Sequence, residues 1–137
     1  MGDKGYIETA SWCLDNGFNV VLVGDKDSFD RALGVQDNER RVLNTVLREG
    51  YSFDLENLAR LALKADAVVS PDTGILHLAD AIGAKVIGLY GPTSPAKYAP
   101  YNNQGYVVSR FDSDQNVQNI PSQEVIKRLK EVVQTWN

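Results

Sequence analysis

Three short apolar runs, each ending at a glycine, a proline or a polar turn, constrain the fold of this chain most. They cover residues 20–23, 67–70 and 86–90 and are rich in β-branched side chains. Continuous apolar runs of this length are typical of strands buried on both faces of a parallel sheet. Segments with helical spacing of apolar residues lie between and after them. This alternation predicts βαβ units, and therefore an α/β fold with a small doubly wound parallel sheet.

The other elements follow from periodicity and stop signals. Helices are predicted, in chain order, over residues 5–16, 27–33, 37–42, 55–64 and 74–82 and from Ser122 onward. We expect Leu55 on the inner face of the helix over 55–64 and Trp136 on that of the last helix. Short strands are predicted over 43–47 and 106–109. Because no linker or repeat interrupts the 137 residues, we expect a single domain over 1–137.

Charge and composition exclude several classes of function. The net charge is −4 and the basic residues are scattered, whereas nucleic acid and anionic lipid favour clustered Lys and Arg. No apolar run approaches the roughly 20 residues of a membrane span, and the first residues lack the apolar core of a signal peptide. The single cysteine, Cys13, cannot form a disulfide within the chain and fits a reducing compartment. We therefore expect a cytoplasmic protein that does not bind nucleic acid.

One polar loop, residues 70–74, runs from the end of a predicted strand directly into a predicted helix. Ligands of such sheets bind outside the carboxyl ends of the strands. Gly74 allows a tight turn and close approach of a bulky ligand. The first N–H groups of the helix would present a partial positive charge there, which suits a diphosphate. Asp72 and Thr73 can cap the helix or bind ligand hydroxyls, and His77, one turn further on, can donate or accept a hydrogen bond.

The same residues also have purely structural interpretations. Asp72 or Thr73 in front of a helix is commonly a simple N-cap. An isolated histidine such as His77 is commonly a structural or surface residue. His77 is the only histidine of the chain, which excludes a metal site built from several histidines.

A second loop of the same kind follows the strand over 86–90. Gly91 permits close approach, Pro92 stiffens the turn, and the hydroxyls and amides of Thr93 and Ser94 suit phosphate oxygens. Taken alone, this is an ordinary strand-exit turn. Because both loops lie at the ends of adjacent strands of the predicted sheet, together they favour a binding site.

The central block, residues 68–95, resembles the signature of glycosyltransferase family 9, the heptosyltransferase-like enzymes. Residues 72–83 read D-T-G-I-L-H-L-A-D-A-I-G, and residues 90–95 read Y-G-P-T-S-P after the intervening strand. The family pattern is D-[ST]-G-x-x-H-x-A-x-A-x-G, then a strand, then [FY]-G-x-T-x-P. Weaker similarity at 20–24 and 50–55, and again at 120–125, extends the resemblance over nearly the whole chain.

The resemblance implies the C-terminal, Rossmann-like half of a two-domain GT-B fold. In this family that half binds a nucleotide-activated sugar, ADP-heptose in the best-known members, and the N-terminal domain binds the acceptor and supplies the general base. The implied reaction is metal-independent transfer with inversion, with no cofactor and with no catalytic residue in this chain. The implied partners are an ADP-sugar donor, the missing N-terminal acceptor domain and a glycan or lipid-linked acceptor of lipopolysaccharide synthesis. The implied location is the cytoplasm or the inner face of the inner membrane.

Carried over residue by residue, the resemblance gives a set of donor-binding positions. The amides of Thr73 and Gly74 would hold the diphosphate, and Asp72 and His77 would meet sugar or phosphate oxygens. Phe53 would pack against adenine or belong to the core, and Lys4 would contact phosphate or remain solvated. The full set is Asp72, Thr73, Gly74, His77, Gly91, Pro92, Thr93, Ser94, Phe53 and Lys4.

Other hypotheses remain beside the enzyme-half hypothesis. A free-standing nucleotide-binding or regulatory module would keep the pocket without transferase function, whereas an enzyme half alone would transfer sugar poorly or not at all. A response-regulator-like domain needs an acidic cluster and a lysine at strand ends, which Asp25, Asp72 and Lys85 match poorly. A dinucleotide fold lacks its G-x-G-x-x-G turn here. Exposed Val and Trp side chains on the last helix would promote self-association.

Overall fold

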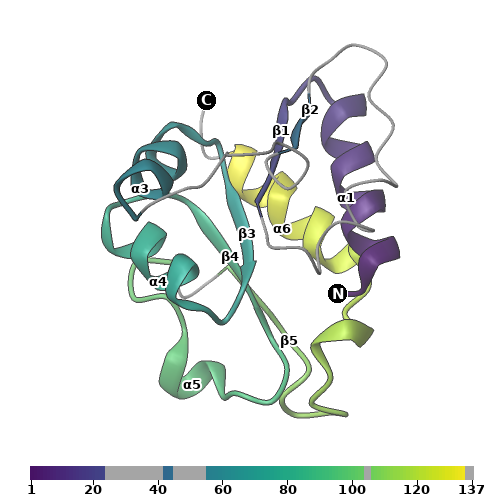
Figure 1. Ribbon diagram of the computed structural model, residues 1–137. Helices are drawn as coiled ribbons and strands as arrows, with labels where there is room; N and C mark the ends of the chain where they lie inside the picture. Colours follow the sequence, from purple (N-terminus) through teal and green to yellow (C-terminus); the bar gives the residue numbers. More distant parts are fainter. Residues whose placement is uncertain (24–41, 45–54, 104–105, 135–137) are drawn as a thin grey trace. The chain divides into compact units, whose positions relative to one another are not determined.

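The computed structural model describes residues 1–23, 42–44, 55–103 and 106–134. These belong to two compact units, one spanning Gly2–Ser52 and the other comprising Met1 and Phe53–Asn137 (Figure 1). The prediction of a single domain over 1–137 stays a prediction.

The Gly2–Ser52 unit contains one described helix and two short parallel strands. They are α1 (Asp3–Asp15), β1 (Val20–Leu22) and β2 (Val42–Asn44), and Val20 of β1 pairs with Val42 of β2. The helix begins two residues earlier than predicted and ends before Gly17, whose φ of 86° lies in the left-handed region. The strand predicted over 43–47 is confirmed at its start.

The prediction that β1 is buried on both faces is wrong. Val20 and Leu22 are half-buried, whereas Val21 between them is 39% exposed. This alternation arises because α1 packs against β1 and covers one face of it. The predicted helix over 27–33 lies outside the described residues, as does that over 37–42 except for Val42, which is in β2.

The second unit holds a three-stranded parallel sheet in the order β3-β4-β5. Val68 pairs with Val86, and Gly88 pairs with Val107. Helices α3 and α4 pack on one face of this sheet and α6 on the other (Figure 1). The predicted α/β fold with parallel strands and helices on both faces is therefore confirmed. Its elements are α3 (Leu55–Lys64), β3 (Val68–Pro71), α4 (Gly74–Ala81), β4 (Val86–Tyr90), α5 (Pro95–Tyr98), β5 (Val107–Ser109), the 3-10 helix η2 (Val117–Asn119) and α6 (Ser122–Gln134).

The central strand β4 organises the core because all five of its residues are buried. On the α4 face, Val86 and Tyr90 pack with Leu76 and Ala79. Gly88 keeps the strand close to α4, since a Cβ there would lie 3.1 Å from Leu76 Cδ2 and 2.7 Å from Tyr90 Cε2. On the α6 face, Val125, Leu129 and Val132 are buried.

Two details of the predicted helices turn out differently. Leu55, expected on the inner face of α3, is 71% exposed. It is the first residue of the helix, and the buried side of α3 is reached only at Ala62. Trp136 lies outside the described residues. No helix among those described is long and apolar enough to span a membrane.

Candidate functional site

The two polar loops meet at the carboxyl ends of β3 and β4, which are neighbouring parallel strands. The backbone N–H of Asp72 donates to the carbonyl of Leu89 at 3.2 Å, so the first loop begins hydrogen-bonded to the second strand. Pro71 is the last residue of β3, although the sequence had indicated that it stops the strand one residue earlier. Its missing N–H costs nothing in this position at the strand end.

Asp72 joins the two loops through its carboxylate. Its Oδ1 lies 2.6 Å from Nε2 of His77, and its Oδ2 accepts a hydrogen bond from the Thr93 hydroxyl at 2.8 Å. The Asp72 side chain is 18% exposed and that of His77 43% exposed. One carboxylate thus holds the first turn of α4 and the turn after β4 together, with the imidazole open to solvent.

The start of α4 carries no side-chain cap. Thr73 occupies the N-cap position with extended backbone, but its side chain accepts no hydrogen bond from the helix amides. The Thr73 hydroxyl instead lies 3.2 Å from the Ser70 hydroxyl, and Asp72 is engaged as described. The simple capping interpretation of Asp72 and Thr73 is therefore wrong. Thr73, Gly74 and Ile75, at the start of this helix, are exposed.

The two loop glycines differ in what surrounds them. A Cβ on Gly74 would meet nothing within 4 Å, and its φ lies outside the left-handed region. Gly91 is buried, and a Cβ there would lie 2.6 Å from the Val117 backbone nitrogen and 3.0 Å from the Gln115 carbonyl oxygen. The close approach that Gly91 permits is therefore made by the chain's own 115–117 backbone.

That backbone is ordered by its own polar turn. Asn119 and the Asn116 N–H both donate to the Asp114 carboxylate, and these hydrogen bonds lower the pKa of Asp114. Gln115 adopts a φ of 57°, in the left-handed region. Sequence reasoning missed this turn, whose only signal is the run of Asp, Gln and Asn before η2.

The residues after Gly91 are more exposed than Gly91 itself. Pro92 is exposed and Ser94 half-buried. The Ser94 carbonyl accepts hydrogen bonds from the N–H groups of Lys97 and Tyr98, which opens α5. Of the predicted hydroxyls in this turn, that of Thr93 is the one that the structure brings to Asp72.

Tyr90, which the sequence analysis did not single out, binds the segment that follows the Gly91–Ser94 turn. Its fully buried hydroxyl donates to the Tyr98 carbonyl at 2.6 Å. Burial, and then the negative charges of Asp72 and Asp80, raise the pKa of Tyr90 to about 12. The phenol is therefore a permanent hydrogen-bond donor at neutral pH.

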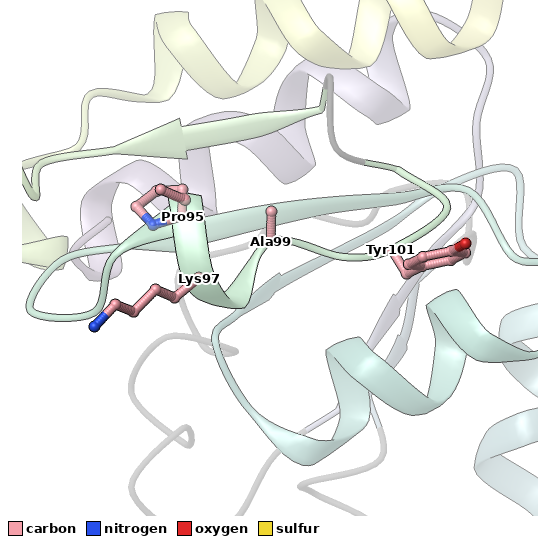
Figure 2. A pocket seen from close by; sticks show the side chains of 5 residues that line it. Pro95, Lys97, Ala99 and Tyr101 are labelled. Atoms are coloured by element: carbon pink, nitrogen blue, oxygen red, sulfur yellow. The ribbon is translucent and has the colours of Figure 1, made fainter.

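A pocket of about 440 Å³ lies along α5 and the residues after it (Figure 2). Its lining includes Pro95, Lys97, Ala99 and Tyr101. Figure 2 shows Lys97 and Tyr101 at opposite sides of it. None of the residues predicted from the sequence lines this pocket.

The roles predicted for Lys4 and Phe53 stay predictions. Lys4 belongs to the other unit, where its 93% exposed side chain lies 3.9 Å from Glu8 of the same helix. Phe53 lies outside the described residues. Within the part of the chain that the structure describes, no three His, Cys, Asp or Glu side chains gather as metal ligands.

Comparison with known proteins places this arrangement in a family. The family model of glycosyltransferase family 9 (heptosyltransferase) matches residues 3–129. A lipopolysaccharide core heptosyltransferase of Haemophilus influenzae is 32% identical over 112 residues, covering 81% of this chain and 32% of the relative. Lipopolysaccharide heptosyltransferase 2 of Escherichia coli is 29% identical over 106 residues, covering 75% of this chain and 30% of the relative.

A solved structure agrees in fold. The glycosyl transferase family 9 protein of Veillonella parvula superimposes with a TM-score of 0.78 at 19% identity, over 97% of this chain and 42% of that protein. The chain thus spans about a third of the length of the curated relatives it matches. The match of the family model over most of the sequence, with the D-T-G-x-x-H and G-P-T-x-P loops joined through Asp72, shows that the chain belongs to glycosyltransferase family 9.

Proposed function

We propose that this chain is the donor-binding part of an inverting, metal-independent glycosyltransferase and holds the diphosphate of a nucleotide-sugar at the start of α4. The observation that carries the proposal is the uncapped, exposed first turn of this helix beside an engaged Asp72. Helix N–H groups without side-chain partners bind anions well, because they combine free donors with the positive end of the helix dipole. The ligand we expect is an ADP-sugar, and the names of the relatives suggest that its sugar is a heptose.

Asp72 and His77 have complementary tasks in this proposal. Asp72 is already bound to His77 and Thr93, which fixes its carboxylate, yet each oxygen keeps a second lone pair for a sugar hydroxyl. Among the described residues, no partner is found for Nδ1 of His77. The half-exposed imidazole can therefore meet a phosphate or sugar oxygen while its other nitrogen stays on Asp72.

The turn from Gly91 to Ser94 closes the phosphate side of the site. Thr93 ties this turn to Asp72, and we expect the amides of Thr93 and Ser94 and the Ser94 hydroxyl to face the ligand. In an inverting transfer, an acceptor hydroxyl attacks the anomeric carbon and the nucleoside diphosphate departs with the bonding electron pair. Donors placed in advance around the departing oxygens stabilise the charge that develops on them. Lys4 and Phe53 remain proposed contacts to phosphate and adenine.

The general base and the acceptor-binding domain would come from a second part of the enzyme. That part would bind a glycan or lipid-linked acceptor in the cytoplasm or at the inner face of the inner membrane. The alternative is a nucleotide-binding module without transferase function. Coexpression with an N-terminal acceptor domain of a family 9 enzyme distinguishes them, because only an enzyme half is expected to restore sugar transfer. Transfer by the isolated chain would contradict both.

The binding claim is tested by titrating ADP, UDP and GDP into the chain by calorimetry. We expect ADP to bind most tightly. Asp72→Ala and His77→Ala each remove hydrogen bonds that involve a charged group, so each should weaken ADP binding by about tenfold or more.

Asp112→Ala is the matched control for these variants. It also removes an aspartate, but from an exposed position on the loop after β5, and should leave the affinity unchanged. Wild-type protein that is folded and binds none of the three nucleotides would overturn the proposal. Equal losses in the Asp112 control would show that the effect is not local to α4.

A further inference from the structure

A carboxylate within α4 binds the same chain segment that Asp72 binds, at the other end of that segment. Asp80, in the last turn of the helix, is 3% exposed. Its two oxygens accept the backbone N–H of Asn102 at 3.1 and 3.2 Å, and Oδ1 also accepts Nδ2 of Asn103 at 2.6 Å. A buried carboxylate is thus held by two consecutive residues of one loop.

The asparagines extend this attachment to the sheet. Asn103 is 3% exposed; its Nδ2 also donates to the Ala84 carbonyl at 3.1 Å, and its Oδ1 accepts the Val86 N–H at 3.3 Å. Asn102 Nδ2 donates to the Asp80 carbonyl at 3.0 Å. The loop is therefore bound to the end of α4 and to the first residue of β4 by hydrogen bonds that leave little freedom for the backbone at 102–103.

Residues 91–103, here called the donor segment, follow β4 and return to the last turn of α4. Near its start, Thr93 donates to Asp72. In its middle, the Tyr98 carbonyl accepts the buried Tyr90 hydroxyl. At its return end, Asn102 and Asn103 bind Asp80, as described. Two aspartates, Asp72 just before α4 and Asp80 in its last turn, thus fix both ends of the donor segment.

We infer that Asp80 is a positioning residue for the nucleoside diphosphate: it fixes the return end of the donor segment so that Thr93 stays on Asp72 and the turn before α5 is ordered before the ligand arrives. The inference rests on the proposed function of the α4 site. Its physical basis is preorganisation. A loop ordered in the free protein loses less conformational freedom on binding, so the affinity is higher than for the same contacts made by a loose loop.

Variants of Asp80 and Thr93 can distinguish a positioning role of Asp80 from a merely structural one. Asp80→Asn keeps the size of the side chain but turns an N–H group toward the Asn102 N–H. Thr93→Val keeps the shape of the side chain and removes the hydroxyl. If Asp80 acts through Thr93, each variant weakens ADP binding by roughly tenfold, and Asp80→Asn in the Thr93→Val background weakens it further by less than about twofold. If Asp80 only supports the fold, the two losses multiply.

Two further variants keep the test decisive. Asn103→Asp places a carboxylate against Asp80 and should weaken ADP binding, whereas the exchange Asp80→Asn with Asn103→Asp again pairs a donor with an acceptor and should recover a large part of the affinity. This rescue is the measurement to use if Asp80→Asn alone does not fold. Val125→Ala, on the opposite face of the sheet, is the control: it removes a fully buried side chain and should lower stability without changing ADP affinity.

The outcomes separate the inference from the function on which it rests. Wild-type protein that binds no nucleotide ends both. If the wild-type protein binds ADP, any one of three results ends the inference and leaves the donor site intact. These are unchanged affinity in Asp80→Asn, losses that multiply when it is combined with Thr93→Val, and no rescue in the exchange. Non-additive losses together with rescue support it.

Discussion

At the scale of single residues, the site depends on the fact that Asp72 does not cap α4. An aspartate in front of a helix usually caps it, but here its two oxygens are taken by His77 and Thr93. The helix amides therefore lack a cap from Asp72, and we propose that an external anion binds them. A sequence can show that these residue types stand at these spacings, but it cannot show which of two competing hydrogen bonds the carboxylate makes.

Tyr90 provides a prediction with a definite pH dependence. Its pKa is raised from its ordinary 10.0 to about 12, so folding favours the neutral phenol. The stabilisation is complete below pH 10 and is lost as the pH rises from 10 to 12. Tyr90→Phe, which leaves the Tyr98 carbonyl without its donor, should cost about 1–3 kcal/mol near neutral pH.

Urea unfolding of both proteins at several pH values measures this difference. The gap in the free energy of unfolding between wild type and Tyr90→Phe should narrow as the pH rises through this window. A gap that stays constant would show that the Tyr90 hydroxyl is not the titrating group.

At the scale of elements, periodicity predicted most of the second unit. The strands over 67–70 and 86–90 and the helix over 74–82 were found within about a residue, because β4 is apolar throughout and α4 has a clear stop at Gly83, whose φ is 95°. Leu55 and Val21 were misplaced because periodicity defines the apolar side of an element but not which neighbours cover it. The contacts of Asp80 and Gly91 could not be predicted, since their partners are about 20 residues or more away in the sequence.

Gly91 gives the element-scale prediction. A Cβ at this position would lie 2.6 Å from the backbone nitrogen of Val117, so Gly91→Ala must push the strand end and the 115–117 segment apart. We expect it to lower the free energy of unfolding by about 1–3 kcal/mol, measured by urea denaturation. Gly74→Ala is the matched control, because its Cβ would enter open space and alanine favours the helix. Equal losses of stability in both variants would refute this account of Gly91.

At the scale of the whole molecule, the sequence identified the family and the chemistry that the family implies, but not how much of an enzyme this chain represents. The chain spans 32% of its Haemophilus influenzae relative, and we propose that the acceptor-binding domain and the general base belong to another part of the enzyme. The capacity that we propose for the chain by itself is binding of the nucleotide-sugar. That capacity depends on whether the amides at the start of α4 meet a diphosphate.

The most direct measurement is a titration of ¹⁵N-labelled protein with ADP, followed through the backbone amide resonances. The account predicts that the amides of Gly74 and Ile75 shift most, with Thr93 close behind, and that adenosine without phosphates leaves them in place. Shifts confined to the α5 pocket around Lys97 and Tyr101, with the α4 amides unmoved, would contradict it.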